Sequence, residues 1–532
     1  MTQPPPEKPV APLSIPIFRA FWIAMVFSQI GTNAHDVAIG WLMTEFTDSA
    51  LVVTSIQIAA TLPIFLLGVP AGALADIVDR RLLILRTQMF MFILCLALAG
   101  LAHFELLNPV LLLLFTALLA IATALATPGL QATVPDLVPS SSLPNALALG
   151  SSSVNIARAV GPAIAAVILG FSAPPFVFLF NGLSFLGIIL VLYRWKPKAP
   201  LVKLPPESLF GAVRIGFRYT RNSPLFQKVL WRAILFVLPA SAMWALLPLF
   251  ARNHLSTSAT TYGILMTMLG FGAILGVVFL PKLRKSLSQQ ALSLVGTIGL
   301  SSGVILLSFC QNWLHAGMVL VGLGVCWLLG MTTLNLAAQT ELPSWVRARG
   351  LGIHLIVFAG SMALGGMIWG LMAESFGSMM ALRISGLGGF LFAMAAILLP
   401  LRQPQPDSLA AAHPWPEPPV GRHIALEQGP VLVTVEYRIE EKDREAFLQA
   451  IMALKVARLR DGAYRWSLHE QVEQMGVFVE SFELESWAEH IRQHERVTKA
   501  DAQIEKVVDS FHRGESDPVV RHFVGRMPIS PR

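Results

Sequence analysis

The chain has 532 residues, of which 54% are hydrophobic and only 13% are charged, and its mean hydropathy is +0.63. No soluble protein of this size needs so much apolar surface, so the composition excludes that class and predicts an all-α polytopic membrane protein. Residues 1–402 carry 23 Lys and Arg against 11 Asp and Glu, whereas residues 403–532 carry 16 against 21. The basic part is also the apolar part, so the positive charge reflects membrane topology, and no nucleic-acid partner is expected.

Twelve apolar runs are long enough to cross ~30 Å of hydrocarbon, which takes ~20 helical residues. They are residues 19–43, 50–75, 82–104, 108–128, 147–170, 174–194, 226–250, 260–280, 289–311, 314–338, 350–372 and 379–400. Residues 1–18 are Pro-rich, lack a signal-peptide pattern and are predicted to be an N-terminal tail. The polar linker 195–225 divides the runs into two six-helix halves, 19–194 and 226–402.

Lys and Arg gather in the linker and in the other even-numbered connections. Because positively charged loops stay on the cytoplasmic side, both termini are predicted to be cytoplasmic. The chain is therefore expected to be a multi-pass protein of the inner (plasma) membrane, with the lipid bilayer as its partner.

A polar stripe runs along the first predicted helix. Gln29, Asn33, Asp36 and Gly40 follow one another at steps of four, three and four residues, which places them on one helix face. Such a stripe predicts a water-filled cavity, and Asp36 is interpreted as a carboxylate that carries a proton, since ionisable groups inside membranes seldom lack a function. Two other interpretations stay open for Asp36: a hydrogen-bond partner between helices, and a hydrated residue near the outer surface.

The connection between the second and third runs reads Gly72-Ala-Leu-Ala-Asp76-Ile-Val-Asp79-Arg80-Arg81. It resembles the signature loop between helices 2 and 3 of the major facilitator superfamily, Gly-x-Leu-Ala-Asp-Arg-x-Gly-Arg-Arg, from which it departs at two positions. Gly72 is expected to let a neighbouring helix approach closely, and Asp76 to accept hydrogen bonds from a helix N-terminus or to pair with a base. Arg80 and Arg81 are expected to hold this gating loop on the cytoplasmic side. Ile77 stands where the signature has Arg, and Asp79 where it has Gly. Asp79, followed by the two arginines, is expected to rebuild the charged contact that is lost with the Arg at position 77.

The fifth predicted helix carries Asn155 and Arg158 on one face, followed by Gly161 and Pro162. An unpaired guanidinium near mid-membrane costs several kcal/mol, so Arg158 should meet a carboxylate, a substrate anion or a water path, and Asp36 is the candidate partner. The alternative is an Arg158 side chain that reaches the cytoplasmic side along the cavity. Gly161-Pro162 resembles the Gly-Pro-x-x-Gly-Gly element on helix 5 of superfamily antiporters, with alanines in place of the last two glycines.

The two halves repeat at a constant offset of 204 residues. The matching pairs are Gly72 with Gly276, Arg80 with Arg284, Arg81 with Lys285, Pro139 with Pro343 and Gly161 with Gly365. Parallel six-helix repeats are expected where two bundles rock about a site at the membrane midplane. The second copy lacks the acidic residue, because Leu280 stands where the first half has Asp76. Glu374, near the end of the eleventh run, is interpreted as an exposed boundary residue.

After Leu401 the composition changes to a Pro-rich linker, 403–429, and then to a small α+β domain, 430–525. The domain is predicted to be ferredoxin-like, with the order βαββαβ and elements near 431–439, 442–460, 464–472, 476–482, 487–511 and 519–524. Glu480-Ser-Phe-Glu-Leu-Glu-Ser-Trp487, with His490 and His494, resembles the dimeric α/β-barrel domains named for antibiotic-biosynthesis monooxygenases, which implies self-association. The two histidines have metal-compatible spacing but no evident third ligand, so no metal and no cofactor is expected.

Twelve spans, the 72–81 loop and the C-terminal domain together resemble the transmembrane secretion effector branch of the superfamily, near the enterobactin exporters. The resemblance implies an exporter of amphiphilic small molecules, siderophore- or drug-like, that works by proton antiport and alternating access and has no catalytic residue. Two alternatives are a membrane-tethered monooxygenase-like enzyme and a sensor derived from a transporter. Twelve spans are far more than an anchor needs, which favours the transporter.

Overall fold

A computed structural model describes residues 10–195, 209–401, 408–410, 412, 415 and 424–525. Contacts divide the chain into two compact units. The first unit contains Met1–Leu209, Leu230–Asn335 and His354–Leu401 and is a bundle of helices. The second unit contains Phe210–Val229, Leu336–Ile353 and Arg402–Arg532.

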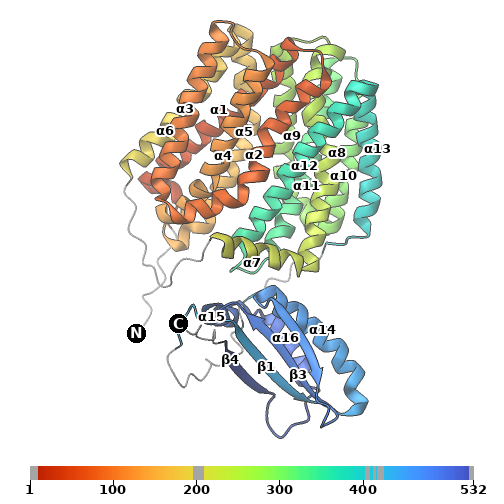
Figure 1. The fold of residues 1–532 in the computed structure, drawn as a ribbon. Coiled ribbons are helices and arrows are strands. Elements are labelled where there is room, and N and C mark those ends of the chain that lie inside the picture. Colours follow the sequence, from red (N-terminus) through yellow and green to blue (C-terminus); the bar gives the residue numbers. More distant parts are fainter. Residues whose placement is uncertain are drawn as a thin grey trace, which may run out of the picture. The chain divides into compact units, whose positions relative to one another are not determined.

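Twelve long helices make up the bundle in the described residues and continue into the second unit at some of their ends (Figure 1). They are α1 Pro16–Phe46, α2 Ala50–Ile77, α3 Arg80–His103, α4 Pro109–Leu137, α5 Leu143–Phe171, α6 Pro174–Arg194, α8 Pro224–Leu249, α9 Ala259–Ser286, α10 Gln289–Leu307, α11 Trp313–Thr340, α12 Arg347–Phe376 and α13 Ser378–Ile397. Short helical turns lie at Pro12–Ser14, Ser140–Ser142 and Phe250–His254. Eleven of the described helices are long and apolar enough to span a membrane by length and composition. The remaining long helix is α1, whose polar stripe lowers its hydropathy.

Local sequence sets where these helices begin. Ser49, Asp79, Asn108, Ser258 and Ser288 are N-cap residues whose side chains accept a backbone N–H of the first turn. The ends were harder to predict. The helix expected over 108–128 continues to residue 137, because a membrane helix tolerates internal prolines when its neighbours satisfy the freed backbone groups.

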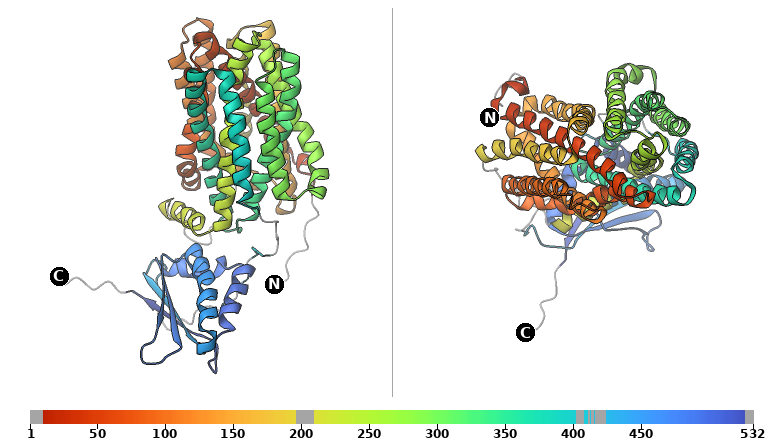
Figure 2. Two further views of the ribbon diagram at one scale, coloured as in Figure 1. Left: turned by 90° about the vertical axis from the view of Figure 1, so that its right-hand side faces the viewer. Right: turned by 90° about the horizontal axis from the view of Figure 1, so that it is seen from above.

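The bundle consists of two repeated halves, as the constant offset predicted. An ideal Cβ at Gly161 on α5 would lie 2.5 Å from the Cβ of Asn33 on α1, so these two helices are in close contact. The matching Gly365 on α12 packs in the same way against Ser241 on α8, the first helix of the second half. Seen along the bundle, the helices of the two halves gather in two groups (Figure 2).

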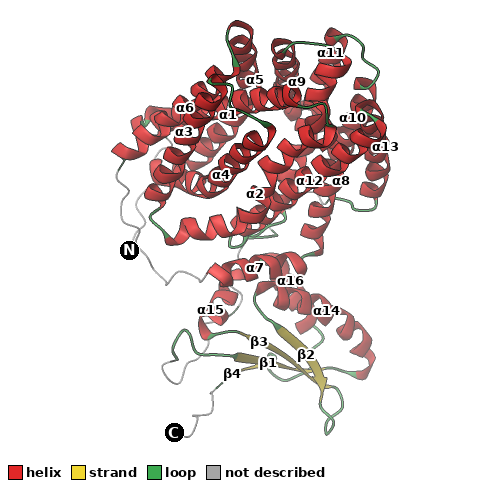
Figure 3. Ribbon diagram, turned by 45° about the horizontal axis from the view of Figure 1, so that its top comes forward, coloured by secondary structure: helices red, strands yellow, loops and turns green. Residues whose placement is uncertain are grey.

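The second unit contains the C-terminal α+β domain. Its elements are β1 Val431–Arg438, a short turn Glu441–Asp443, α14 Arg444–Asp461, β2 Arg465–Glu470, β3 Val477–Leu484, α15 Trp487–Arg496, α16 Lys499–Asp509 and β4 Val519–Val524. All neighbouring strands are antiparallel in the order β2-β3-β1-β4, which is the predicted ferredoxin-like arrangement. The helices cover one face of this sheet, where alternate residues of β1 are buried (Figure 3).

Two expectations for this unit were incomplete. The single helix predicted over 487–511 is two helices, because Thr498 and Asp501 form a capping box that starts α16. The linker 195–225 contains a further helix, α7 Leu209–Arg221, whose 13 residues are too short and too basic to read as a membrane span.

Candidate functional site

A cavity of about 330 Å³ lies between the two halves of the bundle. Its walls come from α1, α2 and α5 of the first half and from α8, α9, α11 and α12 of the second. Asn33, Asp36 and Arg158 line it, together with Gly40 and Pro162. Three of the four residues of the polar stripe on α1 therefore line this cavity.

Asp36 and Arg158 share this cavity, yet neither forms a hydrogen bond or an ion pair with any residue in the described part of the chain. The expected pairing of the two is therefore absent in this conformation. Asp36 is exposed to the cavity, whereas its neighbours from Val37 to Thr44 are buried. Close contact of α1 with α5 brings both charges to one cavity without joining them, which leaves a carboxylate and a guanidinium open to water or to a ligand.

Gln29 and Asn155, the other two predicted cavity residues, do not line the cavity. The Gln29 carbonyl accepts a hydrogen bond from Nδ2 of Asn33 at 2.8 Å, one turn further along α1. Nδ2 of Asn155 donates to the Ser151 carbonyl at 3.2 Å. Both residues therefore take part in hydrogen bonds within their own helices.

The second half contributes an aromatic wall that sequence reasoning did not locate. Trp244 on α8 and Trp327 on α11 meet edge to face with ring centroids 5.5 Å apart, and Phe358 on α12 lies 6.3 Å from Trp327. Tyr262 on α9 also lines the cavity, and its hydroxyl would lie 3.1 Å from a Cβ placed on Gly40. These residues come from four helices, so no local spacing could have brought them together. The cavity has a charged wall on one half and an aromatic wall on the other.

Contacts between the halves close the cavity at one end, called here the outer end because it holds the α1–α2 and α12–α13 connections predicted to lie outside. Oε2 of Glu374 on α12 accepts hydrogen bonds from the Ser49 hydroxyl at 3.1 Å and from the Leu51 N–H at 3.2 Å, and so caps α2 of the opposite half. Nearby, Thr54 packs against Gly370. The interpretation of Glu374 as a boundary residue missed this contact, because its partner lies more than 300 residues away.

The opposite, inner end is open. No atom lies within 4 Å of a Cβ placed on Gly72, so the close helix approach expected there does not occur in this conformation. One turn earlier on α2, a Cβ placed on Gly68 would lie 3.2 Å from the Ile356 Cγ1 of α12. On α5, Leu147 and Ser151 are exposed. The two halves therefore meet at the outer end and separate toward the inner end.

In the gating loop, each described charge binds a helix end. The Asp79 carboxylate accepts the Leu82 N–H at 2.9 Å and caps α3. Arg80 forms an ion pair with Asp136 at 2.9 Å, and Arg81 donates to the last carbonyls of α6. The Asp76 backbone belongs to the last turn of α2, and its side chain lies outside the described part of the structure.

The C-terminal domain holds a cluster of histidines. The ring of His490 lies 4.8 Å from that of His494 and 4.7 Å from that of His522 on β4. Among the described residues, no group of three or more His, Cys, Asp or Glu side chains is arranged to hold a metal ion. Burial lowers the pKa of His490 to about 3 and that of His494 to about 4, so both rings are neutral near pH 7.

Two repeated six-helix halves around a central cavity define a transporter of the major facilitator fold. A solved bacterial homologue of the human lysosomal transporter Spinster, in an inward-facing and occupied conformation, superposes with a TM-score of 0.60 at 15% identity, covering 73% of this chain and 97% of that one. The nucleoside transporter NupG gives a TM-score of 0.58 at 11% identity and covers 72% of this chain and 99% of its own.

The chain belongs to the transmembrane secretion effector family, whose model matches residues 7–528. It is 25% identical to the staphyloferrin A transporter of Staphylococcus aureus over 69% of this chain and 92% of that relative. It is also 25% identical to the enterobactin exporter EntS of Salmonella typhi over 72% of this chain and 92% of that one. The protein is therefore a multi-pass membrane transporter for small molecules, and not an enzyme. The likeness of its C-terminal domain to the monooxygenase-like barrels stays a prediction.

Proposed function

We propose that the protein exports amphiphilic, anionic small molecules, siderophore- or drug-like, in exchange for protons and by alternating access. The observation that carries this proposal is a cavity between repeated halves that holds one carboxylate and one guanidinium, both without a partner among the described residues. Relatives named as a siderophore transporter and a siderophore exporter support the direction and the substrate class.

The two walls of the cavity suit the two parts of such a substrate. A carboxylate, sulfonate or phenolate pairs with the planar Arg158 guanidinium, which has no ion-pair partner among the described residues. An aromatic or aliphatic part packs against Trp244, Trp327 and Phe358, where burial of apolar surface stabilises it by ~25 cal/mol per Å². A purely apolar molecule would leave Arg158 unpaired, so the site selects for an anion.

Asp36 supplies the coupling. When the cavity opens outward, Asp36 takes up a proton and the substrate anion leaves. When the cavity opens inward, Asp36 releases the proton and a new anion binds beside Arg158. A carboxylate can carry out this exchange only if each of its two charge states favours a different conformation.

The test is transport of a defined anion by the reconstituted protein. With naphthalene-1-sulfonate as a permanent aromatic monoanion, export by the unmodified protein should follow an imposed pH gradient. Asp36→Asn should abolish the gradient-driven part while exchange of labelled for unlabelled anion continues, because exchange does not require the carboxylate to change its charge. Asp48→Asn removes an exposed carboxylate that does not line the cavity and should behave like the unmodified protein.

Gradient-driven export at full rate by Asp36→Asn would show that another group carries the proton. Export that is insensitive to pH in the unmodified protein would contradict proton antiport altogether. Failure to bind this anion or a panel of related sulfonates and carboxylates would contradict the anionic substrate class.

A further inference from the structure

The second unit brings together three segments that are far apart in the sequence. They are α7, the connection between α11 and α12 formed by residues 341–346, and the C-terminal domain. The segments of the bundle that belong to this unit are the first turn of α8, the end of α11 and the start of α12, all of them in the second half. No described residue of the first half belongs to this unit, so within it the domain is joined only to α7 and to segments of the second half.

Tyr219 on α7 lies at the centre of this junction and is 2% exposed. Its hydroxyl donates to the Glu341 carbonyl at 3.0 Å, and its ring meets that of Trp345 edge to face at 5.7 Å. The Arg460 guanidinium of the domain lies over the same ring at 5.7 Å. One buried side chain therefore contacts all three segments.

Charges extend the junction around Tyr219. Arg214 of α7 forms an ion pair with Glu485 at 2.7 Å, and Arg218 lies 3.5 Å from the same carboxylate and donates to the Gly462 carbonyl. On the other side, the Arg496 guanidinium lies over the ring of Trp345 at 4.7 Å. Two arginines of α7 thus meet one carboxylate of the domain, while an arginine of the domain covers the tryptophan of the connection.

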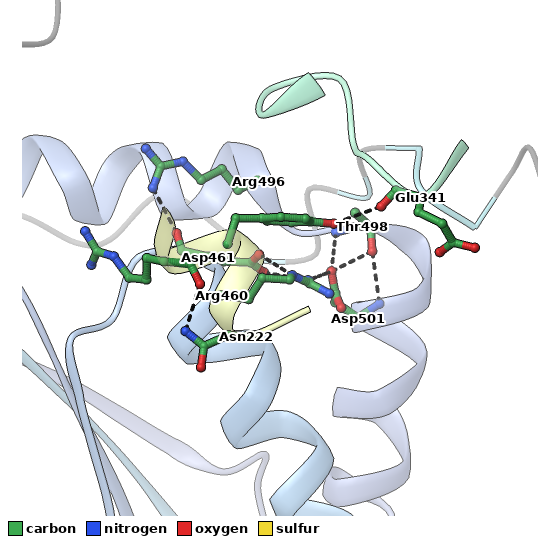
Figure 4. A network of polar contacts seen from close by, with 9 residues as sticks. Asn222, Glu341, Arg460, Asp461, Arg496, Thr498 and Asp501 are labelled. Atoms are coloured by element: carbon green, nitrogen blue, oxygen red, sulfur yellow. Dashed lines mark hydrogen bonds and ion pairs between the residues drawn. The ribbon is translucent and has the colours of Figure 1, made fainter. Parts of the chain in front are cut away.

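Hydrogen bonds within the domain fix the side chains of Arg460 and Arg496, the two arginines that contact Tyr219 and Trp345 (Figure 4). Arg460 makes two hydrogen bonds to Asp461, at 2.8 and 3.0 Å, and one to Asp501 at 2.6 Å. Arg496 donates to the Asp461 carbonyl at 2.9 Å and to Glu489 at 2.5 Å. Side chains fixed in this way lose little further freedom on docking, which favours a defined interface over a loose tether.

The docked segments are the ones that must move when the inner end closes. Closure requires α2 and α12 to pack beyond Gly68 and Ile356, and therefore requires the first turns of α12 to shift. Those turns are held by α7, since a Cβ placed on Gly216 would lie 3.3 Å from the Arg349 Cβ and 3.5 Å from the Ile353 Cδ1. The domain in turn holds α7 and the 341–346 connection.

We propose that the C-terminal domain is a brake on the transporter: docked on α7 and on the 341–346 connection, it stabilises the conformation with a closed outer end. Release of the domain lets the first turns of α12 move and raises the population with an open outer end. The proposal rests on the alternation proposed above and adds an intramolecular partner that regulates it.

The test reads the outer end directly and needs no substrate. Thr54 is 1% exposed at the closed outer contact, so in a variant that lacks the three native cysteines, Thr54→Cys should react with a membrane-impermeant maleimide only while the outer end is open. The reaction rate is then proportional to the population of the conformation in which the outer end is open. Glu485→Arg or Arg214→Glu places like charges across the junction and should raise the rate about threefold or more.

Three control variants separate an effect of the junction from other causes of a changed rate. Glu473→Arg makes the same charge change in the exposed turn between β2 and β3 and should leave the rate unchanged. The exchange Arg214→Glu with Glu485→Arg should bring the rate back toward that of the unmodified junction. Glu374→Gln weakens the outer contact itself and should raise the rate whatever the domain does.

If Glu374→Gln raises the rate while the junction variants leave it unchanged or lower it, the brake is wrong and the alternation stands. If Glu374→Gln has no effect either, alternating access is contradicted and the brake fails with it. An increase in the junction variants that the charge exchange reverses would support the brake.

Discussion

Asp36 and Arg158 show what residue spacing can and cannot establish. The steps from Gln29 to Asp36 place these side chains on one face, and Asn33 and Asp36 do line the cavity. The same spacing says nothing about depth or partners, and neither Gln29 nor Asn155 lines the cavity. Ion pairing between Asp36 and Arg158 was a reasonable expectation from the cost of a buried charge, but a water-filled cavity lowers that cost, so the pair is not required.

The absence of a pair leads to a prediction about stability. Asp36→Asn and Arg158→Gln should change the thermal unfolding of the detergent-solubilised protein additively, with a coupling energy below ~0.5 kcal/mol, because the two groups share no contact in this conformation. Unfolding of the two single variants and the double variant measures this coupling. A coupling of 1–3 kcal/mol would instead show that the two charges pair in the dominant state.

Arg158 itself should determine affinity for the anion. Arg158→Gln should weaken binding of naphthalene-1-sulfonate about tenfold or more, because a charge-assisted contact contributes ~1.5–3 kcal/mol. Tryptophan fluorescence of the cavity wall can report the binding. Arg86→Gln removes an exposed arginine that does not line the cavity and should leave the affinity unchanged. Equal affinities in the two variants would remove Arg158 from the site.

At the scale of helices, small residues decide where two elements meet. Gly161→Ala places a Cβ 2.5 Å from the Asn33 Cβ and 2.9 Å from the Ile30 carbonyl, so α1 and α5 must move apart. We expect a loss of ~1–3 kcal/mol, seen as a lower melting temperature in detergent. Gly150→Ala on the same helix has no atom within 4 Å of its Cβ and should be neutral or stabilising by up to ~1 kcal/mol. Equal effects would contradict the close contact.

The helix α15 should respond to acid. His490, His494 and His522 have pKa values lowered by burial, to about 3 and about 4 for the first two, from an ordinary value near 6.5. The unfolded domain therefore binds more protons than the folded one below pH 6.5, and stability present above this pH is lost as the pH falls toward 4. Asp461 and Asp509, whose pKa values burial raises to about 6, act in the opposite direction between pH 6 and 4, but they are two groups against three histidines.

Amide hydrogen exchange of α15 in the full-length protein, corrected for the intrinsic rate, should therefore become faster from pH 7 to pH 5. His494→Gln should flatten this dependence, whereas His469→Gln, at an exposed position on β2, should not. A pH dependence that is unchanged in His494→Gln would assign the effect to other groups.

For the whole molecule, the sequence was most informative where a physical rule applies along the chain. Membrane-length apolar runs and a constant offset of 204 predicted the long helices and their repeat, and the residue pattern of 430–525 predicted the strands. Features formed by distant residues were missed: the aromatic wall of Trp244, Trp327 and Phe358, and the cap that Glu374 provides for α2. The helix α7 was missed because a short basic amphipathic helix resembles a linker.

The polar stripe has a consequence for how the chain is made. Of the twelve long described helices, α1 is the one too polar to be counted as a span by composition, and an Asp near the centre of a helix costs ~3 kcal/mol on insertion. Yet α1 leaves the ribosome first, while its main packing partners α5 and α6 follow more than 100 residues later. We expect a nascent chain ending after α3 to leave α1 extractable or accessible to protease, and one ending after α6 to protect it. Insertion of α1 would then be delayed while synthesis continues: the residues that suit α1 to transport postpone its entry into the lipid until α5 and α6 have been made.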